Sequence, residues 1–246
     1  NDVLVLYPAT PPKSQEYPHP VYATMAGLII WIMICIILVI VKFFLHNKIS
    51  YLSDIERSTN AIILGIIPYY KKEEMPVSQL VVVNNPKSGI TEALRSLRTN
   101  LQFISSIDGN SKIMGITSSI SAEGKTFVAI NMAGIIAMSG KKVVILDLDL
   151  RKPRIHKAFD VDNSRGMSTI YIKKDKLENC IYKTTIDNLD IIPSGPIPPN
   201  PPELIVSAQK DIVLNQLKEK YDLIVIDTPP IGIVSDGIEI IRNADY

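Results

Sequence analysis

The residues from Ser119 to Thr126 (SISAEGKT) carry the clearest chemical signal in the sequence. They follow a short apolar run and precede a helical pattern, which is the context required of a phosphate-binding loop of the form GxxxxGK[ST]. In such a loop, backbone N–H groups and the helix N-terminus surround phosphate oxygens, while the Lys125 ammonium reaches the terminal phosphates and the Thr126 hydroxyl can ligate Mg²⁺. The residues expected to surround a nucleotide are Ser121, Ala122, Glu123, Gly124, Lys125, Thr126 and Phe127.

Two residues of this loop depart from the pattern. Ser119 stands where the pattern has its first glycine, and Ala122 adds a methyl group where close backbone approach favours glycine. An ordinary glycine-containing turn is the competing interpretation. The Gly-Lys-Thr sequence at a strand-to-helix junction favours the phosphate-binding loop over that turn.

Carboxylates follow two further apolar runs. VVILDLDLR places Asp147 and Asp149 beyond one strand, and LIVIDTPP places Asp227 beyond another. Because the carboxyl ends of parallel strands face one crevice, we expect these side chains near Lys125. A carboxylate there can hold Mg²⁺, and another can accept the proton of an attacking hydroxyl. Alternatively, each Asp is only the cap of the next helix.

The elements that must position these residues alternate between strands and helices. Short β-branched runs predict strands at residues 112–117, 142–147, 189–192 and 223–227, and a helix at 126–139 that stops at Gly140. This alternation is typical of βαβ units and a parallel sheet. We therefore predict an α/β fold with flanking helices.

A further helix is predicted at residues 91–104, TEALRSLRTNLQFI. Its spacing places apolar side chains on one face, namely Leu94, Leu97, Leu101 and Ile104. Glu92, Arg95 and Arg98 lie on an opposing arc, as a solvated face or as half of a subunit contact. We adopt the subunit contact as the hypothesis.

One segment predicts a membrane span. Residues 23–41 contain no charged side chain and, as a helix, would extend roughly 28 Å, close to the hydrocarbon core of about 30 Å. The segment lacks the basic flank, shorter apolar core and cleavage site of a signal peptide. Lys42, Lys48 and Arg57 follow it and only Lys13 precedes it, which places the following chain in the cytoplasm.

The resulting domain organisation has four parts. Residues 1–22 form a proline-rich extracytoplasmic segment, residues 23–41 the transmembrane helix, residues 42–80 a juxtamembrane linker and residues 81–246 the α/β domain. The composition excludes other classes of protein. With 26 Lys and Arg against 25 Asp and Glu, the chain has no global basic field for nucleic acid, and its two cysteines exclude a disulfide framework.

These motifs resemble those of the bacterial tyrosine kinases (BY-kinases) of capsule and exopolysaccharide assembly. The phosphate loop, Asp147–Arg151 and Asp227–Pro230 are similar to that family's Walker A, A′ and B motifs, and Glu92, Arg95 and Arg98 reproduce its ExxRxxR helix. The segment before the domain resembles the end of a Wzz-like chain-length-determinant module. The resemblance implies a P-loop NTPase fold preceded by one transmembrane helix.

The resemblance also implies an activity and partners. It implies ATP- and Mg²⁺-dependent tyrosine autophosphorylation between copies that assemble as a ring, which controls polysaccharide polymerisation and export. Lys125, Asp147, Asp149 and Asp227 would be catalytic, and Thr126, Asp147 and Asp227 would hold the metal; which of the first two carboxylates is the base stays open. Implied partners are the polysaccharide polymerase and export machinery and a tyrosine phosphatase, at the bacterial inner membrane.

Two rival functions remain open on the sequence. A ParA/MinD-type ATPase switch shares the sheet and loop, but carries an extra lysine where this chain has Ile120. A non-catalytic membrane scaffold that sets polysaccharide chain length is the second rival. The family pattern continues beyond Ala244-Asp245 into another strand and a tyrosine cluster, so we expect this chain to be an internal piece with an incomplete sheet edge.

Overall fold

The computed structural model describes residues 19–45, 49, 51–69, 80–104, 111–205, 209–232, 236–242 and 244–246. The chain divides into two compact units, residues 1–62 and residues 63–246. The predicted proline-rich segment before residue 19 and the end of the predicted linker, residues 70–79, lie outside the described residues.

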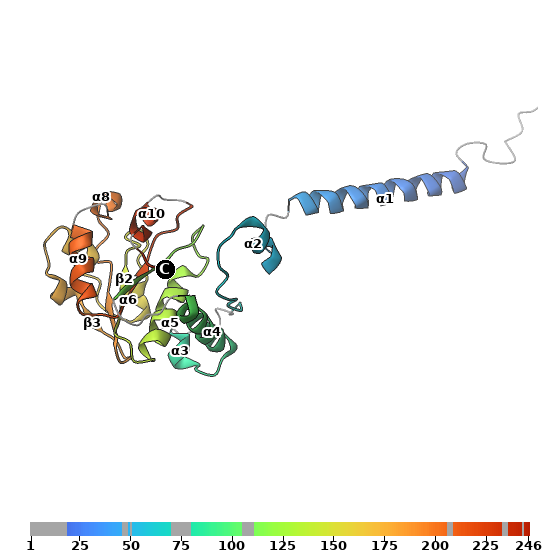
Figure 1. Cartoon of the computed structure of the whole chain (residues 1–246). Helices are drawn as coiled ribbons and strands as arrows, with labels where there is room; N and C mark the ends of the chain where they lie inside the picture. The colour runs from blue at the N-terminus through green and yellow to red at the C-terminus, as the bar shows by residue number, and fades with distance from the viewer. Residues whose placement is uncertain are drawn as a thin grey trace, which may run out of the picture. The chain divides into compact units, whose positions relative to one another are not determined.

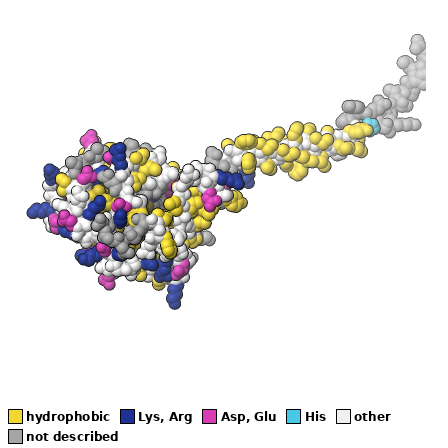
Figure 2. Space-filling model, viewed as in Figure 1, with side chains coloured by type: hydrophobic (Ala, Val, Ile, Leu, Met, Phe, Trp, Pro, Cys, Tyr) yellow, Lys and Arg dark blue, Asp and Glu magenta, His cyan; other side chains and the backbone are white. Residues whose placement is uncertain are grey.

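The first unit contains a long apolar helix, α1 (Pro20–Phe44), and a short one, α2 (Leu52–Ser58). Proline at the start of α1 loses no helix hydrogen bond, because the first N–H groups of a helix have no intrahelical partner. None of the side chains of α1 is buried, and Figure 2 shows a surface that is almost entirely hydrophobic. Within the described part of the chain, α1 is the one helix long and apolar enough to cross a membrane.

The second unit is built on a five-stranded sheet with the order β1-β5-β2-β4-β3 (Figure 1). Its strands are β1 (Lys112–Ile116), β2 (Val143–Asp147), β3 (Tyr182–Lys183), β4 (Leu189–Ile192) and β5 (Leu223–Asp227). The four longer strands are parallel and β3 is antiparallel to β4. The parallel sheet is confirmed, and each predicted strand lies within one residue of the observed bounds.

Each face of the sheet packs against its own hydrophobic cluster. Along β5, Leu223 and Val225 belong to one cluster while Ile224 and Ile226 belong to the other, because successive side chains of a strand point to opposite faces. The first cluster is covered by α3 (Val81–Asn84), α4 (Gly89–Ile104) and α5 (Lys125–Ala137), which lie together in Figure 1. The second includes residues of α7 (Met167–Tyr171), α9 (Gln209–Lys218) and α10 (Asp236–Ile241).

Helix α4 carries the charged arc that the sequence predicted, on a helix whose opposite side is buried. Leu94 and Leu101 are in the core, but Ile104, which the spacing assigned to the same face, is 48% exposed at the end of the helix. Residues 63–69, predicted as linker, belong to the second unit: the Asn100 side-chain amide donates to the Leu64 carbonyl at 2.7 Å.

Several short elements complete the unit. A 3₁₀ turn (Leu177–Cys180), α6 (Ile155–Ala158) and α8 (Pro201–Ile205) were not predicted individually. Tyr246 pairs with the outer edge of β1 in the parallel manner: its N–H donates to the Ile113 carbonyl at 3.2 Å and its carbonyl accepts from Gly115 N–H at 3.0 Å. A Cβ on Gly115 would meet Ile241 at 2.2 Å, so this strand needs glycine where α10 crosses it.

Candidate active site

The loop between β1 and α5 adopts two left-handed backbone conformations. Gly124, the N-cap of α5, has φ 99°, and Ala122 has φ 73°. A side chain at Gly124 would meet nothing within 4 Å, so glycine is needed there for backbone conformation and not for space. Ala122 takes the same region with a Cβ, at a cost of roughly 1 kcal/mol. The loop therefore keeps a tight turn at the N-terminus of α5 despite its departures from the glycine pattern, which is the position where phosphate-binding loops hold anions.

Contacts from within and outside the loop hold its first residues. The Glu123 carboxylate accepts the N–H groups of Ser119 at 2.9 Å and Ile120 at 3.2 Å. After β5, the Ile231 and Gly232 N–H groups donate to the carbonyls of Ser118 and Ser119, at 2.9 and 3.1 Å respectively.

Sequence reasoning missed Gly232. A Cβ at this position would approach the Ser119 carbonyl oxygen to 2.3 Å, so the close approach requires glycine. Its only sequence signal is a glycine shortly after the Asp-Thr-Pro-Pro run. For Glu123, predicted only as a nucleotide contact, the structure adds a role in bracing the loop.

Lys125 connects the loop to the strand ends. Its Nζ lies 2.9 Å from Asp149 Oδ2 and 3.2 Å from Asp227 Oδ1, and the Thr126 hydroxyl donates to Asp227 Oδ2 at 2.6 Å. The side chains of Lys125, Asp149 and Asp227 are 9%, 8% and 1% exposed, so the two ion pairs are largely shielded from water. The predicted convergence of loop and strand-end acids is thus observed for four residues, which we call the Lys125 cluster: Lys125, Thr126, Asp149 and Asp227.

Asp147 lies beside this cluster but is engaged differently. Its register partner in the sheet is Asp227, yet its Oδ1 accepts the Asp149 N–H at 3.3 Å and its Oδ2 accepts the N–H groups of Arg154 and Ile155 at 3.2 and 3.1 Å. Asp147 thereby caps the N-terminus of α6, the alternative that the sequence left open for any strand-end Asp.

Burial and mutual repulsion set the protonation of these acids. Burial, the charge of Asp227 and that of Asp149 raise the pKa of Asp147 to about 8, against the lowering effect of its backbone hydrogen bonds. Burial also raises the pKa of Asp227, although Lys125 and the Thr126 hydroxyl oppose this. Burial would lower the pKa of Lys125, but the charges of Asp227 and Asp149 outweigh it and raise the pKa. The lysine is therefore charged at neutral pH.

The remaining predicted residues lie around this cluster or on α4. Ser121, Ala122 and Glu123 are exposed in the loop, and Phe127 in α5 packs against the hydrophobic core. On α4, Arg95 pairs with Glu92, and the buried Nε of Arg98 has no hydrogen-bond acceptor among the described residues. None of the three contacts the Lys125 cluster through a described hydrogen bond or ion pair.

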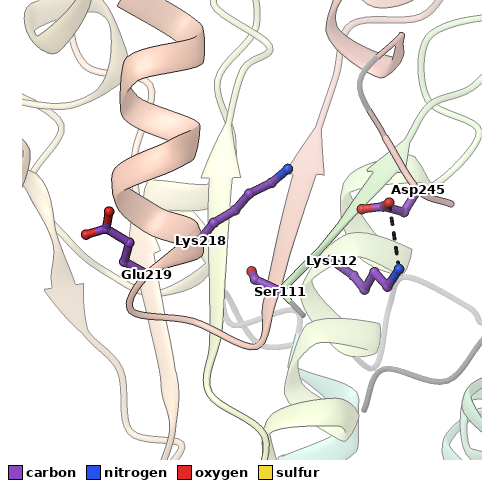
Figure 3. A pocket seen from close by; sticks show the side chains of 5 residues that line it. All are labelled: Ser111, Lys112, Lys218, Glu219 and Asp245. Carbon is purple, nitrogen blue, oxygen red and sulfur yellow. Dashed lines mark ion pairs between the residues drawn. The ribbon is translucent and has the colours of Figure 1, made fainter. Parts of the chain in front are cut away.

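A separate hollow of about 460 Å³ lies at the opposite end of β1 (Figure 3). Its lining residues are Ser111, Lys112, Lys218, Glu219 and Asp245. Lys112 Nζ lies 4.0 Å from Asp245 Oδ1 across it. Because it opens at the amino ends of the strands, it belongs to the side of the sheet away from Lys125.

The parallel sheet, the loop at the N-terminus of α5 and the strand-end acids define a P-loop nucleotide-binding domain. Comparison with known proteins places it more narrowly. Residues 111–244 match the AAA domain family. The chain is 42% identical over 166 residues to CapB of Staphylococcus aureus. The matched region covers 68% of this chain and 72% of CapB.

Two further relatives extend the comparison. The tyrosine-protein kinase wzc of Salmonella typhimurium is 32% identical over 257 residues, which covers 99% of this chain but only 35% of that protein. The solved structure of the kinase domain of the Escherichia coli tyrosine kinase ETK superposes with a TM-score of 0.64 at 34% identity, over 72% of this chain and 68% of that one. This chain belongs to the tyrosine-protein kinases of bacterial capsule and exopolysaccharide synthesis, as its motifs predicted. It is a membrane-anchored, nucleotide-binding member of that family.

Proposed function

We propose that this chain transfers the terminal phosphoryl group of ATP to tyrosine hydroxyls, with copies of the same protein as the main acceptors. The observation that carries this proposal is the position of Lys125, whose ammonium lies between two shielded carboxylates at the mouth of a loop with backbone N–H groups. Phosphoryl transfer needs little covalent chemistry from a protein and depends mainly on positioning and charge stabilisation. The Lys125 cluster has the residue types for both.

The residues fit a nucleotide and a magnesium ion. The loop N–H groups of residues 121–127 would hold phosphate oxygens at the N-terminus of α5, and Lys125 would leave its carboxylates to pair with the transferred group. Thr126 and Asp227, already 2.6 Å apart, would hold the metal. Magnesium keeps several waters and phosphate oxygens as ligands, so it does not need the three-residue protein cluster that the described residues lack. When bound, the metal neutralises charge that develops on the phosphates.

Asp149 is the better candidate for the group that accepts the tyrosine proton. Asp147 uses both of its oxygens to hold backbone N–H groups and is fully buried, whereas Asp149 holds one backbone N–H and binds Lys125 with its other oxygen. Once Lys125 turns toward phosphate, Asp149 Oδ2 is released at the place where a hydroxyl would attack. Asp147 then acts as a positioning residue, because its backbone hydrogen bonds fix the segment that carries Asp149.

We further propose that the transfer takes place at the cytoplasmic side of the bacterial inner membrane, anchored by α1, and regulates polysaccharide polymerisation and export. The polymerase and export machinery and a tyrosine phosphatase are the proposed partners. The proposed self-association uses the arc of Glu92, Arg95 and Arg98. The side chains of Glu92 and Arg95 are 61% and 41% exposed, so a second copy can contact them.

The test is to measure the fate of the phosphoryl group. The full chain in detergent micelles is given ATP, Mg²⁺ and a tyrosine-containing peptide, and phosphotyrosine and free phosphate are quantified together. We expect phosphotyrosine to accumulate, on the peptide or on the chain itself. Release of phosphate to water alone would favour an ATPase switch, and nucleotide binding without turnover would favour a scaffold.

A further inference from the structure

A run of positive charge directly follows the catalytic acids. Residues 150–159, LRKPRIHKAF, contain four lysines and arginines and no acidic side chain. We call residues 151–157 the basic rim. Its composition contrasts with that of the whole chain, in which positive and negative residues nearly balance.

Backbone hydrogen bonds fix the basic rim to the active site. The Lys152 N–H donates to Asp149 Oδ1 at 3.1 Å, while the other oxygen of the same carboxylate binds Lys125. The Arg154 N–H donates to Asp147 Oδ2 at 3.2 Å. The Asp149 carboxylate therefore connects the backbone of Lys152 directly to Lys125.

The rim's side chains are available to a ligand. Lys152, Arg154 and Lys157 are exposed, and their side chains make no hydrogen bond or ion pair with the described residues. Burial and the charge of Lys157 lower the pKa of His156, so that this histidine stays neutral at pH 7. Among the described residues, these three cations have no paired carboxylate, and they follow directly on the segment that carries Asp149.

We propose that the basic rim binds acidic side chains on either side of the acceptor tyrosine and so determines which tyrosines are phosphorylated; this rests on the proposed function. An extended peptide advances about 3.3–3.6 Å per residue, so positions within three residues of the tyrosine lie up to about 10 Å from the point of transfer. The backbone N–H groups of Lys152 and Arg154 donate to Asp149 and Asp147, so both side chains begin within this distance of the acids. Complementary charge at such a rim selects partners and speeds their encounter.

The experiment compares two peptides with the full chain in detergent micelles at saturating ATP and Mg²⁺. One peptide has tyrosine flanked by three glutamates on each side, and the other has glutamines in their place. The double variant Lys152→Gln/Arg154→Gln keeps the backbone N–H groups. Lys157→Gln is a second variant, which touches neither Asp147 nor Asp149. Lys218→Gln removes a positive charge at the opposite end of the sheet and serves as the matched control.

In the unmodified chain we expect a higher kcat/KM for the acidic peptide. The double variant lowers the acidic-to-neutral ratio by roughly fivefold or more, as expected for two partly exposed charge contacts, and Lys157→Gln lowers it less. Added salt lowers the ratio in the unmodified chain. Lys218→Gln leaves the ratio unchanged.

An equal kcat/KM for the two peptides, or a ratio that the rim variants leave unchanged, overturns the proposal. The KM for ATP is measured in a separate ATP titration of each variant. A higher KM for ATP with an unchanged peptide ratio also overturns the proposal, and assigns the rim to the nucleotide. These outcomes differ from failure of the proposed function, in which neither peptide gains phosphotyrosine although nucleotide is bound.

Discussion

Lys125 is held by two acids that would otherwise repel each other in a site with little water. Removing one partner of a buried ion pair is costly because it leaves uncompensated charge. Lys125→Met therefore removes the phosphate ligand and also lowers stability, by about 3 kcal/mol at most, since Asp227 can take up a proton instead. Loss of activity in this variant needs to be read beside its melting temperature.

Asp147 and Asp149 are expected to differ in what their loss does. Asp147→Asn places an amide N–H₂ against backbone N–H groups at the start of α6, so we expect a lower melting temperature and lower activity together. Asp149→Asn has only one backbone donor to satisfy, and Lys125 keeps Asp227 as its counter-charge. We therefore expect a smaller loss of stability than in Asp147→Asn, with tyrosine phosphorylation reduced at least 100-fold, in the range of a lost proton acceptor. Thermal melts and initial rates on the same samples distinguish the two. The opposite pattern would make Asp147 the base.

The raised pKa of Asp147 predicts a pH dependence of stability. Its folded-state pKa, about 8, exceeds the ordinary pKa of an aspartate, 3.8, so the folded protein binds more protons between these values. The free energy of unfolding then falls as pH rises across this window and levels off above about pH 8. Asp227, also raised, adds to the same trend.

Nucleotide-free melts from pH 5 to pH 8.5 check this, with Asp147→Asn as the comparison. The melting temperature of the unmodified chain should fall across the range, and the slope should be smaller in the variant. A melting temperature that rises with pH would contradict this account of the acids.

At the scale of elements, one buried side chain links the helix of the phosphate loop to the helices before it. Asn131 in α5 is fully buried; its Oδ1 accepts the Val82 N–H of α3 at 3.2 Å and its amide donates to the Phe127 carbonyl at 2.8 Å. Without it, the Val82 N–H loses its acceptor in a closed environment.

Asn131→Ala is therefore expected to lower the free energy of unfolding by about 1–3 kcal/mol, the cost of an unsatisfied buried donor. Asn200→Ala removes an exposed contact with Glu203 and should change it by less than about 0.5 kcal/mol. Denaturant titrations measure both. Equal effects in the two variants would mean that α3 does not depend on this contact.

The sequence predicted the longer elements well for a physical reason. Buried runs such as LIVID have few interpretations other than a central strand, and the parallel pattern places their final acids at one edge. The two-residue strand β3 and the four-residue α6 carry too few residues for a periodic signal. The strand order and the close approach of Gly232 to Ser119 depend on contacts between segments distant in sequence, so no local pattern predicts them. The hydrogen bonds of Glu123 to the loop depend on the exact turn of its backbone, which the sequence pattern does not specify.

At the scale of the whole molecule, the proposed self-association can be tested directly. The proposed contact uses the positive charges of Arg95 and Arg98 on α4. Replacing both with negative charges would turn attraction to the neighbouring copy's acidic groups into repulsion. Arg95→Glu/Arg98→Glu is expected to reduce the oligomer to monomers in multi-angle light scattering of the chain in detergent. An unchanged mass would show that this arc is a solvated face. Lys218→Gln, outside the arc, controls for the loss of positive charge.

The central claim is that the Lys125 cluster transfers phosphate to tyrosine, and phosphotyrosine detection on membranes that contain the chain tests it most directly. Wild type, Lys125→Met, Asp149→Asn and Lys218→Gln are incubated with ATP, Mg²⁺ and a tyrosine peptide, and each is checked for folding by its melt. We predict a signal in wild type and Lys218→Gln and none in the two cluster variants. Equal phosphotyrosine in folded Asp149→Asn and wild type, or none in wild type with ATP bound, would contradict the claim.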